Sequence, residues 1–318
     1  MINFYKDYSW LRGFNIIPSW GASIQEAWLR YSPAAFRKEL EMLQTLHANC
    51  IRLWLDPSVW MLSPESVRDC FLDAINAIDE FGMRTMPVLS NRWHDVRYDY
   101  GGIYMENFVD MRPEAFQVYT SYLKDIATPF KSDERILIWD LCNEPQMSSQ
   151  AAPAAELILL GRFADTLRRI DVQQPITIGT HYSGQNINIY AHLCNVLSCH
   201  PYGKTIPELT QQLEQAKSIS EGWGKPIMAN ETIPGAEDDL IRADYLKKAI
   251  PLFEQYGTGW MGWSFHYGKA VSTRRDRVDP NGICGCGFHA WTNSNGTLRD
   301  GLDFLKDKPS RQAPWKNS

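Results

Sequence analysis

Several kinds of segment are missing from this sequence of 318 residues, and each absence excludes a class of protein. No run reaches the roughly 18 apolar residues of a membrane span, so none is expected. Residues 1–7 lack the basic and apolar stretches of a signal peptide. The Gly-x-Gly-x-x-Gly and Walker loops of nucleotide-binding proteins are missing, as is the Gly-x-Ser-x-Gly elbow of serine hydrolases.

An even, regularly spaced set of cysteines and an excess of positive charge are missing too. The seven cysteines are scattered, and several lie in apolar runs where a free thiol packs as a small hydrophobic group. This usage predicts a reducing cytoplasm, unless a leader peptide has been removed. The net charge of -5 and the pI near 5.8 argue against nucleic-acid binding and favour a neutral substrate.

The sequence does contain short apolar runs that alternate with longer stretches of helical periodicity, the pattern of βαβ units. Eight such units without a visible linker predict the α/β class and a single (β/α)8 TIM barrel over residues 1–318. The predicted strands cover residues 11–18, 50–55, 84–90, 136–142, 175–180, 196–200, 226–230 and 259–265.

Serine followed by proline marks two helix starts, at Ser32-Pro33 and Ser63-Pro64, with serine as the N-cap. A closing helix is expected over residues 298–307. The longest loops, residues 91–112 and 268–295, follow the third and eighth strands, on the face where barrel enzymes place their sites. The other helices are expected at residues 113–128, 152–170, 186–193, 206–220 and 236–255.

The fourth predicted strand ends in a polar motif, Asn143-Glu144-Pro145. Because proline disfavours a helical conformation in the residue before it, Glu144 is expected to be extended, with its carboxylate in the barrel mouth. In isolation such a glutamate is most often a solvent-exposed loop residue. Its place at the carboxyl end of a barrel strand favours a catalytic group.

The seventh strand also ends in a glutamate, in Asn230-Glu231-Thr232. Glu144 and Glu231 lie three units apart around a ring of eight, so their side chains are expected to meet across the mouth. Two carboxyl groups about 5–5.5 Å apart are the requirement of a retaining glycosidase. One must donate a proton and the other must attack as an anion, and their mutual repulsion raises one pKa without a metal or cofactor.

These strand ends resemble the clan of retaining glycoside hydrolases with catalytic glutamates on strands four and seven, and within it the cellulase/mannanase-type family 5. The resemblance implies that Glu144 is the general acid/base, that Glu231 is the nucleophile and that Asn143 binds the sugar 2-hydroxyl. It further implies cleavage of β-linked oligosaccharides or glycosides, with a carbohydrate as partner and no cofactor. Short soluble substrates fit the predicted cytoplasmic location.

Three further positions match the same pattern. The resemblance implies that Arg52, on the second strand, supports the nucleophile. It assigns His200-Pro201-Tyr202, after the sixth strand, to an element whose tyrosine hydroxyl contacts the nucleophile. Trp263, on the eighth strand, matches the tryptophan under the sugar. In isolation Arg52 is as easily explained by a buried ion pair, and Trp263 and His200 by core packing.

Weaker candidates for substrate contact share only their place at the catalytic face: Asn91, Trp93, His94, His181, Tyr182, His266 and Tyr267. The segment Cys284-Gly285-Cys286 lacks the second ligand pair of a structural zinc site, so no metal is expected there. Two alternatives to hydrolysis stay open. A transglycosylase would use the same two glutamates, and a carbohydrate-binding barrel would keep the aromatic floor without catalysis. The oligomeric state is not predicted.

Overall fold

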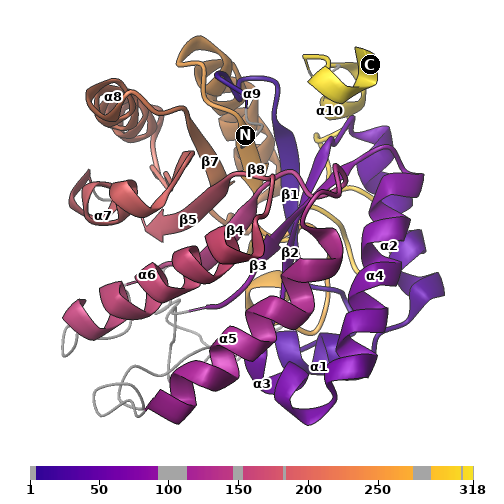
Figure 1. The fold of residues 1–318 in the computed structure, drawn as a ribbon. Helices are drawn as coiled ribbons and strands as arrows, with labels where there is room; N and C mark the ends of the chain where they lie inside the picture. The colour runs from indigo at the N-terminus through magenta and orange to yellow at the C-terminus, as the bar shows by residue number, and fades with distance from the viewer. Residues whose placement is uncertain are drawn as a thin grey trace.

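The computed structural model describes residues 5–91, 113–145, 153–181, 184–274, 288–308 and 311–317. Eight parallel strands close into one barrel in chain order, with β8 pairing to β1, which confirms the predicted (β/α)8 fold (Figure 1). The strands are β1 (Arg12–Ile16), β2 (Cys50–Trp54), β3 (Arg84–Val88), β4 (Trp139–Asn143), β5 (Ile176–His181), β6 (Leu197–His200), β7 (Ile227–Thr232) and β8 (Trp260–Gly262).

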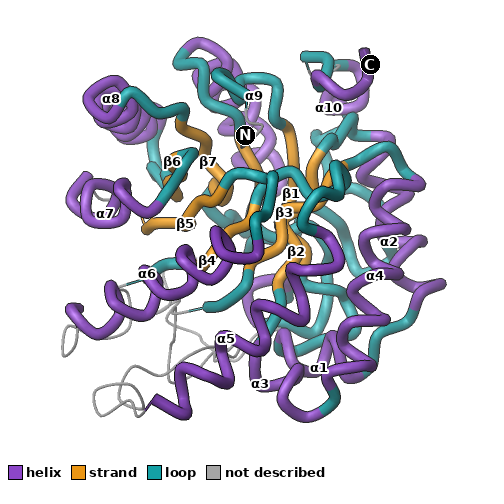
Figure 2. The backbone as a smooth tube through the Cα atoms, in the orientation of Figure 1, coloured by secondary structure: helices purple, strands orange, loops and turns teal. Residues whose placement is uncertain are grey.

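Helices surround the strands, and Figure 2 shows the strands enclosed by them. Helix α2 begins where the sequence predicts, because the Ser32 side chain accepts from the Ala35 amide. The helices are α1 (Ile24–Leu29), α2 (Pro33–Thr45), α3 (Pro57–Leu62), α4 (Pro64–Glu80), α5 (Pro113–Ala127), α6 (Pro153–Ile170), α7 (Gly184–Tyr190), α8 (Ile206–Trp223), α9 (Asp239–Gln255) and α10 (Phe304–Asp307).

Three helix expectations need correction. Helix α4 does begin at Pro64, but the Ser63 side chain makes no capping hydrogen bond. The short helices α1 and α3 were not predicted. The closing helix over residues 298–307 was wrong in extent, because the Arg299 amide bonds to the Trp291 carbonyl and Gly301 has a φ of 79°. Leu298 also forms an antiparallel bridge with Thr292, so the predicted helix does not begin there. Of residues 298–307, only the four residues of α10 are α-helical.

The lower part of the barrel interior is filled by one apolar layer. Its side chains come from six strands or from the residue just before a strand, and Tyr8 and Leu11 pack against them. The layer consists of Cys50, Met86, Ile138, Val196, Met228 and Met261, all buried. Side chains of a strand alternate between its two faces, so the residue two positions further on points inward as well.

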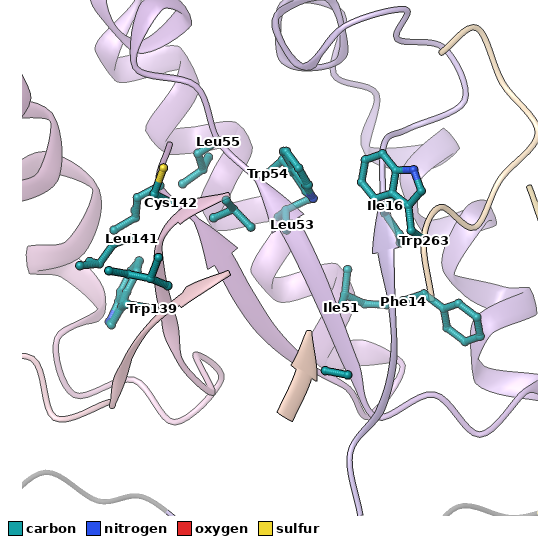
Figure 3. Close-up of a cluster of buried hydrophobic side chains, with 14 of the residues drawn as sticks. Phe14, Ile16, Ile51, Leu53, Trp54, Leu55, Trp139, Leu141, Cys142 and Trp263 are labelled. Carbon is teal, nitrogen blue, oxygen red and sulfur yellow. The ribbon is translucent and has the colours of Figure 1, made fainter. Parts of the chain in front are cut away.

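That alternation places a polar layer directly above the apolar one. Arg52, Asp140 and Asn230 lie two positions after Cys50, Ile138 and Met228, respectively, and each is fully buried. The opposite face of the strands packs against the helices through aliphatic and aromatic side chains. Figure 3 shows part of that outer core, including Phe14, Ile51, Leu53 and Leu141.

The chain ends meet at the N-terminal face of the barrel. The rings of Trp10 and Trp315 lie 5.1 Å apart in an edge contact, and the Arg311 guanidinium donates to Ser9 Oγ at 2.8 Å. Within the described ranges no helix is both long and apolar enough to cross a membrane, and the five cysteines there are free thiols. The cytoplasmic location stays a prediction.

A substitution in the barrel wall tests this packing. A Cβ added at Gly13 would lie 2.5 Å from the Cys50 carbonyl oxygen and 2.6 Å from Met261 Cε. Gly13→Ala is therefore expected to lower the free energy of unfolding by about 1–3 kcal/mol, measured by denaturant titration. Gly161→Ala is the matched control. It lies in α6 with no atom within 4 Å of the added methyl group, and should raise the free energy by about 0.5–1 kcal/mol. Equal stability of Gly13→Ala and wild type would contradict the packing described.

Candidate active site

Arg52 is the centre of the polar layer. Its Nη1 donates to Asn15 Oδ1 and to Glu231 Oε2, both at 2.8 Å. Its Nη2 donates to Asp140 Oδ2 at 2.8 Å and to Asn143 Oδ1 at 2.9 Å, and its Nε donates to Asp140 Oδ2 at 3.0 Å. A guanidinium has five N–H groups in one plane, so these five bonds use all of them. Arg52 thereby fixes groups from strands β1, β4 and β7 relative to one another.

Glu231 sits beside this guanidinium near the end of β7 and is almost fully buried. Tyr202 donates its hydroxyl to Glu231 Oε1 at 2.9 Å, so each carboxylate oxygen has a donor. The pairing of β7 with β8 shifts register between Ala229 and Thr232. Such irregularities re-aim side chains next to active sites.

Glu144 follows β4, where the register against β5 also shifts, between Asp140 and Asn143. The expected extended conformation was wrong: Glu144 has a φ of 45°, in the left-handed region. Its amide donates to the Gly179 carbonyl at 2.7 Å, and its Oε1 lies 2.8 Å from His200 Nδ1. These two contacts hold a backbone conformation that costs about 1–3 kcal/mol in a residue other than glycine.

The two glutamates meet around His200, as the sequence predicts from their strand positions. One oxygen of Glu144, one oxygen of Glu231 and a ring nitrogen of His200 lie within 4.8 Å of one another. His200 Nδ1 is 3.7 Å from Glu231 Oε1. The fold therefore brings together two carboxyl groups that are 87 positions apart in the sequence, counted from 144 to 231.

Burial dominates the protonation of this group. It raises the pKa of Glu144, against which the charges of His181 and Arg52 act only in part. Burial also raises the pKa of Glu231, while His200, Arg52 and the Tyr202 hydroxyl lower it and the charge of Glu144 raises it. Burial lowers the pKa of His200 to about 4, so its ring is neutral at pH 7.

Asn143 and Trp263 lie at the same mouth. Asn143 Nδ2 donates to Asn91 Oδ1 at 3.0 Å, and its Oδ1 accepts from Arg52, which fixes the amide orientation. Asn91 thus orients Asn143. Trp263 lies 5.2 Å from the Trp54 ring, and Figure 3 shows both near the carboxyl ends of the strands.

The other candidates are distributed differently. His181, at the end of β5, lies close enough to affect the pKa of Glu144. His266 instead lies 3.8 Å from Glu39 Oε2 of α2. The ring of Tyr267 packs edge-on against Phe288, 6.0 Å away. Four further positions of the sequence analysis lie outside the described residues: Trp93, His94, Tyr182 and the Cys284–Cys286 segment.

Glu144, His200 and Glu231 form the one group among the described residues with ligand atoms close enough for a metal. Several of their ligand atoms already have partners: both oxygens of Glu231 accept hydrogen bonds, and His200 Nδ1 lies 2.8 Å from Glu144 Oε1. The adjacent guanidinium also disfavours a second cation. This arrangement fits acid–base chemistry better than metal binding.

Four residues of the site were missed: Asn15, Trp54, Asp140 and Asn230. Asp140 accepts from the Asn230 amide at 2.9 Å, and the Arg52 guanidinium stacks 5.0 Å from the Trp54 ring centre. A signal for Asp140 existed in Trp139-Asp140-Leu141, because a charged residue inside an apolar strand is rarely buried unless paired.

Gly179 explains how closely these groups approach. A Cβ at this β5 position would lie 2.6 Å from Arg52 Nη2 and 2.9 Å from His200 Nε2. Only the absence of a side chain there leaves room for the guanidinium and the imidazole.

Two buried glutamates at the ends of β4 and β7 of a closed barrel define a class, the (β/α)8 glycoside hydrolases. The family model described as Cellulase (glycosyl hydrolase family 5) matches residues 37–269, a region that includes both glutamates and Arg52. The chain therefore belongs to glycosyl hydrolase family 5.

Similar proteins include a curated one from Aspergillus terreus, "Probable mannan endo-1,4-beta-mannosidase C", 29% identical over 82 residues, 24% of this chain and 20% of the relative. An exo-beta-1,4-mannosidase from Opitutaceae bacterium strain TAV5 superposes with a TM-score of 0.73 at 17% identity, covering 96% of this chain and 60% of that one. GH5_18 from Streptomyces cattleya in complex with GlcNAc has a TM-score of 0.73 at 14% identity, covering 93% and 78%. These structural likenesses show the fold, and the chain spans only part of each relative.

The Tyr202 hydroxyl offers a test of the site electrostatics. Tyr202→Phe removes a donor to Glu231, and a hydrogen bond to the charged form lowers a carboxyl pKa. The pKa of Glu231 should rise by roughly one pH unit, since such a bond contributes about 1.5–3 kcal/mol and one unit corresponds to about 1.4 kcal/mol. A ¹³C NMR titration of labelled glutamate carboxyls measures it.

Tyr190→Phe is the control, because the Tyr190 hydroxyl donates to a different buried carboxylate, Glu156, at 2.6 Å. It should leave the Glu231 titration unchanged. An unchanged Glu231 titration in Tyr202→Phe would show that the hydroxyl does not stabilise the carboxylate.

Proposed function

We propose that this protein is a retaining β-glycoside hydrolase that works by double displacement, with Glu144 as general acid/base and Glu231 as nucleophile. The observation that carries the proposal is the approach of the two carboxyl groups, one oxygen of each within 4.8 Å. Retaining enzymes hold their carboxyl groups about 5–5.5 Å apart, whereas inverting enzymes need about 6.5–9.5 Å to admit a water molecule between sugar and base.

The two glutamates differ in what surrounds them, and this difference supports their roles. Glu231 accepts from a guanidinium and from a phenol, which stabilise the anion that attacks the anomeric carbon. Burial raises the pKa of both glutamates, and the direct hydrogen bonds from Arg52 and Tyr202 that oppose this are made to Glu231, so we assign the proton to Glu144. Glu144 gives its proton to the leaving oxygen as Glu231 forms the glycosyl ester. It then takes a proton from the water that cleaves the ester.

His200 suits both protonation states of Glu144. Because its ring is neutral, Nδ1 can donate to the ionised carboxylate or accept from the protonated one, depending on the tautomer. The ring is fully buried, so solvent does not compete for that nitrogen. His200 thus keeps the acid/base group in place through both half-reactions.

We propose β-linked glycosides as the substrate class, with short soluble molecules preferred and β-mannosides as the first to test. The names of two relatives, one an endo-mannosidase and one an exo-mannosidase, support this order. Trp263, which packs on the Trp54 ring near the strand ends and is largely buried, is the ring proposed to lie under the apolar face of a pyranose. Asn143, held by Arg52 and Asn91, is the donor proposed for the sugar 2-hydroxyl.

Turnover of a panel of aryl glycosides tests the function. The panel holds the β-glucoside, β-mannoside, β-galactoside and β-xyloside, and an α-L-arabinofuranoside. Glu231→Ala should lose activity by several orders of magnitude, because the attacking group is gone. Glu144→Ala should be rescued by azide, which needs no base and yields the β-glycosyl azide that only a double displacement gives. The product configuration is read by proton NMR.

Glu156→Gln is the matched control, since it removes a buried carboxyl group on α6 outside the site, and wild-type turnover is expected. If both active-site variants equal wild type on every substrate cleaved, the assignment of the two glutamates is wrong. An α-glycosyl azide from a β-glycoside in the Glu144→Ala variant would exclude the retaining route. Sugar binding without turnover by the wild type would support a carbohydrate-binding barrel, and transfer to a sugar acceptor in preference to water would support a transglycosylase.

A further inference from the structure

Asp140 is a fully buried carboxylate in the middle of β4 that takes no part in the roles above. Its Oδ2 accepts from Arg52 Nε at 3.0 Å, from Arg52 Nη2 at 2.8 Å and from Asn230 Nδ2 at 2.9 Å. Its Oδ1 accepts from the amides of Gly179 at 3.0 Å and Cys142 at 3.3 Å. Five donors thus surround one carboxylate, which keeps its position fixed.

The guanidinium lies between two carboxylates. Asp140 takes its Nε and Nη2 hydrogens on one side, and Glu231 takes an Nη1 hydrogen on the other at 2.8 Å. Both ion pairs are buried, so their interaction is screened far less than at a surface. Any change in the charge of Asp140 therefore changes how strongly Arg52 stabilises the Glu231 anion.

We propose that Asp140 is a positioning residue that serves as a second anionic partner of Arg52. It limits how strongly Arg52 stabilises the Glu231 anion, which keeps that anion reactive, and it keeps Arg52 paired once Glu231 is esterified. The inference rests on the proposed double displacement. In the free enzyme, Arg52 has two partners of opposite charge. In the glycosyl ester Glu231 is neutral, and Asp140 remains as the countercharge of the buried guanidinium.

The pairing of Arg52 with Asp140 affects the rates of the two half-reactions in opposite directions. As the pKa of an attacking group falls, it becomes a weaker nucleophile and a better leaving group, a rule measured for thiols and applied here to a carboxylate. Without the charge of Asp140, Arg52 would stabilise Glu231 more strongly. Formation of the ester should then slow, whereas its cleavage, in which Glu231 leaves, should not.

The charged and titratable groups around Glu231 come from several elements. Arg52 faces it from β2, His200 from β6, Tyr202 from the segment after β6 and Glu144 from the end of β4. His181 acts on Glu144 and on His200. From β1, the neutral amide of Asn15 shares Nη1 of Arg52 with Glu231. Asp140→Asn removes the second negative partner of Arg52. It also removes a charge that acts on His200 and changes the acceptor of Asn230 Nδ2 and of the Gly179 amide.

The test is the kinetics of Asp140→Asn on two aryl glycosides of the sugar that the wild type cleaves. With a phenyl leaving group, ester formation limits the rate, and kcat/KM should fall about twofold or more, the loss that half a unit in the pKa of Glu231 gives at a slope of about 0.4–0.5. With a 2,4-dinitrophenyl group, ester cleavage limits kcat, which should at least equal that of wild type. The acid limb of kcat/KM should move to lower pH by about half a unit or more, because Glu231 must be ionised and its pKa falls.

Rates are normalised to active sites counted from the burst of a 2-deoxy-2-fluoro glycoside, so a misfolded fraction does not enter. Asn15→Asp is the second variant, because it adds a negative partner to Arg52, and its acid limb should move to higher pH. Glu156→Gln, which removes a buried carboxyl group outside this network, should shift neither limb nor rate.

Equal losses of Asp140→Asn on both substrates with an unmoved acid limb would overturn the inference, as would shifts of the same sign in Asp140→Asn and Asn15→Asp. These outcomes leave the double displacement intact if the wild type gives a burst and a glycosyl-enzyme by mass spectrometry. Absence of both in the wild type would instead refute the proposed function.

Discussion

The five hydrogen bonds of Arg52 are the constraint on which the rest of the site depends. A planar guanidinium inside a barrel cannot satisfy its N–H groups with water, so each needs a protein acceptor. Those acceptors come from β1, β4 and β7, which links strands far apart in the sequence. The missing side chain at Gly179 on β5 leaves the space for that guanidinium. Arg52 thus holds both Glu231 and Asn143, together with Tyr202 on the first and Asn91 on the second.

The barrel interior is organised in layers, and the layers explain why the site can be both buried and polar. Apolar residues such as Met228 and Met261 fill the lower layer and exclude water. The polar layer lies above it, and hydrogen bonds join its members, such as the one from Asn230 Nδ2 to Asp140 Oδ2. Burial raises the pKa of both Glu144 and Glu231. The two carboxyl groups share this buried environment and differ in their partners, because Arg52 and Tyr202 donate to Glu231 whereas Glu144 contacts His200.

Backbone irregularity is concentrated at the two glutamates. Register shifts occur on β4 and on β7 beside them, and Glu144 has the left-handed conformation. Ile233, two residues after Glu231, has a φ of 77°, which is unfavourable for a β-branched residue, and it is fully buried. The fold therefore accepts local strain where each carboxylate turns into the mouth. In regular strands, the alternation of side chains between the two faces of the sheet would alone decide where these carboxylates point.

Local patterns in the sequence predicted the strand order and the (β/α)8 class, which the structure confirms, and they gave Glu144 and Glu231 as catalytic candidates at strand ends. The sequence also predicted Arg52 and Tyr202 as neighbours of Glu231, through resemblance to a family. Tertiary structure decided the rest. The left-handed Glu144 depends on the Gly179 carbonyl of another strand, and the role of Asp140 depends on the two-sided pairing of Arg52. The direction of His266 toward Glu39 was likewise hidden, since side chains at one barrel face can turn inward or toward a helix. Long-range contacts decide such details, and no local pattern encodes them.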